Sequence, residues 1–308
     1  MATPDPNLIN TTDFFIDPTT VTVDLSDSRK YSFVQSLGTQ VQFGYAGGRY
    51  LNLGDIEGGF VGAEGGAKPV ANPATSAGSI AVREWAVVVP IPKRLLDANP
   101  QAAVSLIRAK LPEAFARGFD NLATTGAGVS GQSNLSQVTN TVSLGTATQA
   151  QGGIWKDFNS GLRILAQSHK RLSGTVLDYI IEPAVNEAVD TTGRPLFVDS
   201  PVGPDTNSVD RSGRLLGRPA SFVDSIQSGA GATGTVGYMG DWSRLLWGTV
   251  GGIQYMVSTE GTYNDGTTVH SAVQENLVLF RAEALIGIQV ADTDAFVRLL
   301  NGTLPPTS

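Results

Sequence analysis

The longest regular pattern in the chain is an alternation of apolar and polar residues near its C-terminal end. Apolar residues occupy every second position from Val278 to Val290, and the opposite positions include Arg281, Glu283 and Gln289. A period of two is typical of a β-strand with one buried face. The pattern therefore predicts a long, half-exposed strand late in the chain.

Two helices are predicted by apolar residues that recur every three or four positions. The first spans residues 97–125, with Asp97 expected to cap its start, Pro112 to kink it and Gly126 to end it. Its apolar face comprises Val104, Ile107, Leu111, Phe115, Phe119 and Leu122. The second begins near residue 153, and its apolar side comprises Trp155, Phe158, Leu162 and Leu165. Strand-like runs follow at 176–181, 238–247 and 252–259, so the chain mixes helices and strands.

Residues 47–92 have the pattern of a long β-hairpin. Residues 49–53 and 79–89 are strand-like, and a glycine-dense run at 57–69 separates them. An arm of about 18 residues reaches roughly 60 Å, whereas a globule of this length has a radius of gyration of about 19 Å. Such a ribbon is too long to be sheltered by its own domain. We expect it to lie across a neighbouring copy.

Residues 1–30 are polar, with only residues 21–25 (Val-Thr-Val-Asp-Leu) alternating, so this arm is expected to be disordered or to lie along another surface. The first ten residues lack the features of a secretory signal. No apolar run approaches the roughly 20 residues that cross a bilayer.

The amino-acid composition excludes several kinds of functional site. The chain has 308 residues and no cysteine, which excludes disulfides, thiolate metal sites and a cysteine nucleophile. Its net charge of -7 argues against a nucleic-acid-binding face, which would be basic. Only 16% of residues are charged, against about 25% in ordinary domains. Either other subunits cover much of the surface, or Ser, Thr and Asn replace charge there.

No motif with clear catalytic or cofactor chemistry is present. The Gly-x-Gly-x-x-Gly runs that begin at Gly126 and Gly229 do not stand between a strand and a helix, as a dinucleotide site requires. His169, expected on the apolar side of the second helix, and His270, expected in a polar loop, form no metal-spaced pair. We expect no metal and no cofactor. A Ser-His-Asp triad assembled in space stays open as an alternative.

Several short sequence motifs occur in a fixed order from the end of the hairpin onward. They lie at residues 87–97, 193–196, 216–219, 240–243, 251–255, 280–283 and 295–299. In this order, over about residues 30–300, they resemble the major capsid proteins of tailed bacteriophages. One departure is Asp292-Thr-Asp294, where members of that family often have a proline.

The resemblance implies an α+β fold of the Hong Kong 97 type, with a peripheral domain, an axial domain, an extended arm and a long β-hairpin (the E-loop). The implied boundaries are 1–46 for the N-terminal arm, 47–92 for the hairpin, 93–145 for the peripheral domain with its spine helix, 146–265 for the axial domain, and 266–308 for the closing strand and C-terminus.

The resemblance also implies the function and the partners. The chain would form pentamers and hexamers of an icosahedral head shell around double-stranded DNA, as a structural protein rather than an enzyme. It would assemble in the cytoplasm of the host bacterium and end in the virion. Implied partners are the chain itself, a separate scaffolding protein and a portal, with a decoration protein left open. DNA would be contacted weakly and without sequence preference, and no membrane is involved.

Charged and aromatic residues of the hairpin and the closing strand are the candidates for contacts between subunits. They are Glu64, Lys68, Arg83, Glu84, Trp85, Arg281 and Glu283. Lys68 as the donor of an isopeptide bond to a neighbour's asparagine is a less favoured role. The alternatives to a phage capsid are an encapsulin-like bacterial compartment with the same fold, a hydrolase with the spatial triad, and a secreted β-rich adhesin.

Overall fold

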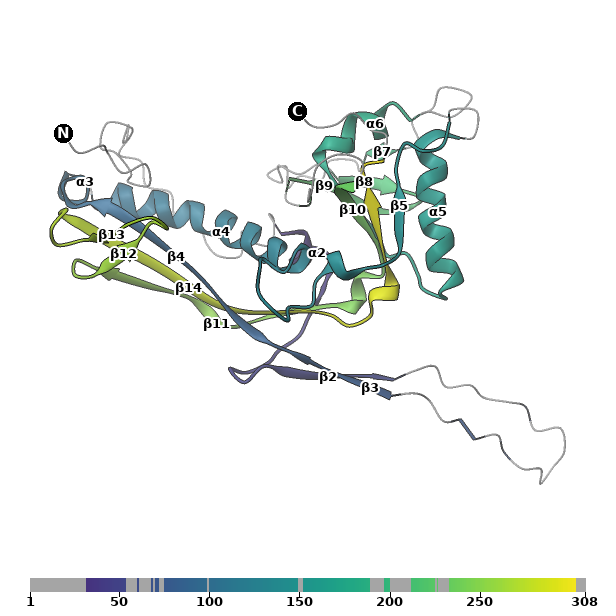
Figure 1. Cartoon of the computed structure of the whole chain (residues 1–308), viewed down its shortest axis with the longest axis horizontal. Coiled ribbons are helices and arrows are strands. Elements are labelled where there is room, and N and C mark those ends of the chain that lie inside the picture. Colours follow the sequence, from purple (N-terminus) through teal and green to yellow (C-terminus); the bar gives the residue numbers. More distant parts are fainter. Residues whose placement is uncertain are drawn as a thin grey trace.

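The computed structural model describes residues 32–53, 60, 68, 70–71, 75–98, 100–148, 152–188, 197–199, 212–224, 226 and 233–302. These residues form a four-stranded sheet with a long helix, a seven-stranded sheet, and a two-stranded ribbon that projects away from both (Figure 1). The predicted mixture of helices and strands is therefore present.

The four-stranded sheet contains the predicted closing strand at its centre. Its order is β1 (Thr39–Gln40), β11 (Leu245–Ser258), β14 (Leu277–Val290) and β4 (Val82–Pro92). Helix α4 (Pro100–Thr124) lies over one face of this sheet (Figure 1). The alternating apolar side chains of β14 are buried and Arg281 is exposed, which confirms the predicted strand and its half-exposed character.

Helix α4 is slightly shorter than the predicted helix and starts differently. Asp97 does not cap it, because residues 93–98 form a separate short helix, α3 (Lys93–Ala98), and Pro100 opens α4. Proline suits the first turn of a helix, where its missing N–H has no partner to lose. Pro112 lies inside α4, and Gly126 follows its end with a φ of 79°, as a helix-terminating glycine should.

The seven-stranded sheet forms a second core. Its order is β5 (Thr141–Ser143), β15 (Phe296–Leu300), β10 (Thr235–Gly240), β6 (Gly174–Asp178), β9 (Arg218–Val223), β8 (Ser212–Leu215) and β7 (Val198–Asp199). The second predicted helix is confirmed as α5 (Gly153–Gln167), and it buries Phe158 and Leu165 against this sheet. Gly161 brings α5 close to β10, because a Cβ there would collide with the sulfur of Met239.

The remaining elements are short. They are the helices α2 (Phe33–Leu37) and α6 (Glu182–Asn186), the paired strands β12 (Thr262–Asn264) and β13 (Val269–Ser271), and single 3-10 turns at Leu135–Gln137, Tyr179–Ile181, Trp242–Arg244 and Thr293–Ala295. Helix α2 packs against α4 and β11 and buries Phe33 and Val34. Residues 32–41, which we expected to belong to the arm, therefore join the body of the molecule.

The projecting ribbon pairs β2 (Gly48–Leu53) with β3 (Thr75–Ile80). The predicted hairpin pairing is confirmed, but residues 79–89 are not one strand. The chain breaks at Ala81, and β4 pairs with β14 from Val82 onward. Ile80, only 2% exposed, anchors the root of the ribbon against the sheet.

Strand pairing divides the chain differently from the implied boundaries. β4 lies in the four-stranded sheet rather than in the hairpin of 47–92, and β11 joins the same sheet although 146–265 was assigned to the axial domain. β5 and β15 join the seven-stranded sheet instead of the elements around α4. The cause is that each of these strands pairs with a partner distant in the sequence. The assignment of the two sheets to peripheral and axial domains stays a prediction.

Candidate functional site: the ribbon and the open face of the four-stranded sheet

One face of the four-stranded sheet carries α4, and none of the described residues covers the middle of the other face. Cross-strand pairs define three rows on the uncovered side, which we call the open face. The rows are Val250–Leu285–Glu84, Gln254–Glu283–Ala86 and Met256–Arg281–Val88. Phe43 packs against Gly248 and Gly287 at one end of this face, and β12–β13 covers Leu277 and Leu279 at the other.

The open face holds three of the seven candidate contact residues. Arg281 and Glu283 form a two-bonded ion pair, with Nε to Oε1 at 2.9 Å and Nη2 to Oε2 at 3.1 Å. Their side chains stay 45% and 26% exposed, so the pair contributes at most about 1 kcal/mol to folding. Exposed Met256 and Val88 flank it. The face therefore combines a fixed charge pair with apolar side chains that are exposed among the described residues.

Arg83 and Trp85 lie on the opposite face and contact their own chain. Arg83 donates to the carbonyl of Ser130 at 3.1 Å and to the side chain of Gln132 at 3.4 Å. The indole of Trp85 packs edge-on against Phe115, with ring centroids 5.4 Å apart. Both residues thus stabilise the packing of β4 against α4 and the loop after it. These contacts lie within one subunit, and the role of the two residues between subunits stays a prediction.

Exposed apolar side chains that the sequence analysis did not select lie on the ribbon and in the segments that adjoin its strands in the sequence. Tyr45 and Leu51 are 73% and 70% exposed, and Phe60 and Val70 are also fully or almost fully exposed. The candidate Lys68 is exposed as well, while Glu64 lies outside the described residues. The sequence signal that could have identified these residues is an apolar residue that stands alone in a glycine-rich segment. Their exposure gives this part of the chain an apolar surface that the other described residues do not cover.

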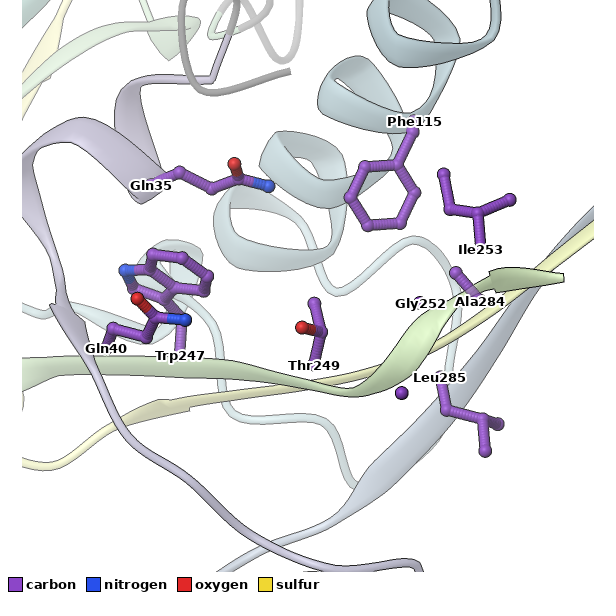
Figure 2. Close-up of a pocket in the computed structure, with 10 residues that line it drawn as sticks. Gln35, Gln40, Phe115, Trp247, Thr249, Gly252, Ile253, Ala284 and Leu285 are labelled. Carbon is purple, nitrogen blue, oxygen red and sulfur yellow. The ribbon is translucent and has the colours of Figure 1, made fainter. Parts of the chain in front are cut away.

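A hollow of about 140 Å³ lies between α2, α4 and β11 (Figure 2). It opens where β11 bulges, since residues 251–253 stand between the pairs that Val250 and Gln254 make with β14. Figure 2 shows Gln35, Phe115 and Thr249 around it. None of its ten lining residues is charged. The hollow could accept an apolar group but has no acid–base pair for catalysis.

Comparison with known proteins decides what kind of molecule carries these surfaces. A family model described as the phage capsid family matches residues 12–300. The chain belongs to the phage capsid family. It is 32% identical over 292 residues to "Probable major capsid protein gp17" of Mycobacterium phage D29, covering 93% of this chain and 90% of the relative. The protein of the same description from Mycobacterium phage L5 is 33% identical, with 96% and 94% covered.

Solved structures of phage proteins have the same fold as this capsid protein. A chain from Microbacterium phage Oxtober96 superposes with a TM-score of 0.66 at 16% identity, covering 97% of this chain and 95% of that one. A chain from Mycobacterium phage Ogopogo gives 0.66 at 20% identity, with 95% and 99% covered. The expected fold of the Hong Kong 97 type and the resemblance to major capsid proteins are confirmed.

The two histidines of the capsid protein differ from the sequence analysis. His169 does not lie on α5, because the helix ends at Gln167, and it sits exposed in the following turn with a φ of 56°. His270 lies on β13 rather than in a loop. Its ring nitrogens face Asp265 at 3.1 Å and Glu275 at 2.9 Å.

This arrangement of His270 differs from a Ser-His-Asp triad. A triad histidine has one ring nitrogen on a serine hydroxyl, whereas both nitrogens of His270 face carboxylates. Donation from both nitrogens needs the charged ring. The glycine run that begins at Gly126 forms a turn after α4, and only a 3-10 turn follows it. Neither feature has the geometry of the triad or of the dinucleotide site that the sequence analysis considered.

Among the described residues of the capsid protein, no group of three or more His, Asp or Glu side chains could hold a metal ion. No helix in that part of the chain is long and apolar enough to span a bilayer.

Proposed function

We propose that this capsid protein assembles into pentamers and hexamers that close into an icosahedral head shell around double-stranded DNA. The observation that carries the proposal is the β2–β3 ribbon, which projects from the body and pairs only with itself among the described strands. A two-stranded ribbon is marginally stable alone in water. A second subunit would supply the surface that the described part of its own body does not.

The open face of a neighbouring subunit is the surface that we assign to the ribbon. Exposed apolar side chains are present on both partners, with Leu51 on the ribbon and with Met256 and Val88 on the face. The Arg281–Glu283 pair presents both signs of charge in one fixed geometry. Such a pair adds little to folding, but it can set the register of a docking strand through complementary charge.

The acidic balance suits a container for DNA. With a net charge of -7, the chain does not provide the excess of Lys and Arg that would neutralise phosphates and hold the DNA to the wall. A single chain of 308 residues also cannot enclose a genome, so closed symmetry has to supply the size. Both properties support the proposal.

Further partners and the place of assembly belong to the same proposal. Identical subunits can close into shells of different sizes, because the same contact can serve more than one symmetry. A separate scaffolding protein and a portal would fix the size and provide one entry for DNA, and a decoration protein stays open. Assembly would take place in the host cytoplasm and end in the virion.

Deleting residues 58–78 tests the role of the ribbon. The body keeps its two cores in this variant, so we expect the secondary structure measured by circular dichroism to change little. Closed shells should disappear from sedimentation profiles and micrographs, while the wild type forms them under the same conditions. Normal shells from the deleted variant would show that the ribbon does not hold neighbours together.

A further inference from the structure

The hollow between α2, α4 and β11 has walls of aromatic rings that other rings hold in place. Phe115 and Trp247 lie on two of its sides, and both are buried (Figure 2). Trp85 packs edge-on against Phe115, with ring centroids 5.4 Å apart, and Phe119 packs edge-on against Trp247 at 5.6 Å. Because these contacts fix both rings, the hollow is formed before anything binds in it, as ligand sites usually are.

The size of the hollow matches one six-membered ring. Its volume is about 140 Å³, and an engineered apolar cavity of about 150 Å³ in another protein takes up benzene. Sites for drug-sized molecules are larger, at about 300–1,000 Å³. The volume therefore favours a ligand with a single ring.

The polar side chains of the hollow favour a ligand without charge. Gln35, Gln40 and Thr249 contribute amide and hydroxyl groups, and none of the residues that line the hollow is charged. Amides and hydroxyls can donate and accept hydrogen bonds, so they suit a neutral polar group. A charged ligand would lose its hydration without meeting an opposite charge, which is unfavourable.

Glycine preserves space where β11 bulges beside the hollow. Gly251 has a φ of 72°, a backbone conformation that favours glycine. Gly252, which also lines the hollow, has no such requirement, and a Cβ added there would meet no atom within 4 Å. Strands favour β-branched residues over glycine. Glycine at position 252 therefore keeps space open rather than permitting a special backbone conformation.

We propose that this hollow is a binding site for a small, uncharged aromatic molecule with one ring and one polar group, such as benzamide. The ring would lie between Phe115 and Trp247, since aromatic rings pack favourably in edge-on or offset arrangements. Figure 2 shows the side chains of Gln35 and Thr249 reaching the space between these rings, where they would meet the polar group. The site lies within one subunit, so the inference does not depend on the proposed assembly.

A ligand in this hollow would stabilise the junction between the arm and the body. Helix α2 follows directly after residues 1–31, and it packs against α4 and β11. A bound ring would contact all three elements at once. Because a ligand stabilises the state that binds it, α2 should separate from the body less often when the hollow is occupied.

Equilibrium dialysis of the full chain tests the site with benzamide and benzoate, two molecules of nearly the same shape that differ in charge. We expect one benzamide per subunit with a Kd below about 1 mM, which is within the range that so small a ligand can reach. Benzoate should bind at least tenfold more weakly. Equal binding of the two molecules, or no binding of benzamide at about 10 mM, would overturn the proposal.

Phenylalanine at position 249 tests the location of the site. Thr249 is exposed and its side chain points into the hollow (Figure 2), so Thr249→Phe would fill the space with a ring of the chain itself. This variant should bind benzamide at least tenfold more weakly. Thr262→Phe is the matched control, because Thr262 is exposed on β12 and does not line the hollow, and it should bind like the wild type. Unchanged binding by Thr249→Phe, or an equal loss in both variants, would contradict the site.

Hydrogen exchange in α2 gives a second readout that needs no variant. At a benzamide concentration ten times its Kd, opening of the site should become about tenfold rarer. The amide of Gly38, which donates to the carbonyl of Val34 at 2.9 Å, should then exchange about tenfold more slowly. Amides of α5, which does not line the hollow, should exchange at the same rate. No slowing in α2, or equal slowing in α2 and α5, would contradict the site.

Discussion

The buried carboxylate of Asp120 on α4 accepts a hydrogen bond of 2.6 Å from the hydroxyl of Ser32 at the start of α2. It also faces the main-chain N–H groups of Phe33 and Val34 at 3.3 and 3.4 Å. The Ser32 oxygen in turn accepts from the N–H of Gln35. One side chain of the long helix thus satisfies the first turn of α2, the element that joins the arm to the body.

Loss of this carboxylate should destabilise the subunit. Asp120→Ala leaves three buried donors without their acceptor, and we expect a loss of about 3 kcal/mol in the free energy of unfolding. Ser32→Ala removes the cap and one of the three donors to Asp120 but leaves the other two, and should cost less, about 1–2 kcal/mol. Denaturant unfolding measures both. Asp224→Ala, which breaks an exposed ion pair with Arg117, is the control and should cost less than about 1 kcal/mol. Equal losses in all three variants would contradict the role of Asp120.

Close packing at Gly118 should make this position intolerant of alanine. A Cβ there would collide with the indole of Trp85, which is held edge-on against Phe115. Overpacking costs about 1–3 kcal/mol and should exceed the gain of about 1 kcal/mol from replacing glycine in a helix. We expect Gly118→Ala to lower the melting temperature.

Gly161 provides the comparison for Gly118. A Cβ at Gly161 would meet the thioether of Met239, which adapts more easily than an indole. Gly161→Ala should therefore lower the melting temperature less than Gly118→Ala does. The opposite ranking would show that Trp85 is free to move.

Exchanging the charges of the Arg281–Glu283 pair distinguishes a role in the stability of the subunit from a role in contacts between subunits. The double variant Arg281→Glu with Glu283→Arg keeps an ion pair within the strand but reverses the charges that a neighbour meets. We expect unfolding free energy to change by less than about 1 kcal/mol, and shell formation, measured by sedimentation, to fall. Unchanged assembly would show that the pair acts only within its own subunit.

Acid should weaken the β12–β13 unit through Asp265. Main-chain hydrogen bonds from Thr268 and Thr267, followed by the contact with His270, lower the pKa of Asp265 from 3.8 to about 2. A pKa that is lower in the folded state adds stability above pH 4, and this contribution is lost as the pH falls from about 4 towards 2. Unfolding measured across this range should show a smaller decline for Asp265→Asn than for the wild type. Parallel profiles would rule out Asp265 as a cause.

The long helix and the closing strand could be predicted because the periodic spacing of their apolar residues indicates which face is buried. The alternation of apolar residues around Phe280 and their three-to-four spacing around Phe119 each indicate one buried face. This inference does not depend on which element covers that face. The end of α4 could also be predicted, since Gly126 adopts the left-handed backbone that glycine permits.

The break between β3 and β4 could not be predicted from the sequence. Residues 79–89 are continuous in pattern, but Val82 pairs with Gly287, about two hundred positions away. The same non-local pairing directs Trp85 toward α4 and Arg83 toward the loop after it. Arg281 and Glu283 were selected as contacts between subunits, which stays a prediction, and the open face that carries them follows only from the register of β11, β14 and β4.

Negative-stain electron microscopy of the purified chain distinguishes a shell-forming protein from a solitary one. We expect closed, hollow shells of uniform diameter, in which the ribbon of each subunit lies on another. Solitary subunits at every concentration, with the ribbon folded against its own body, would contradict this expectation.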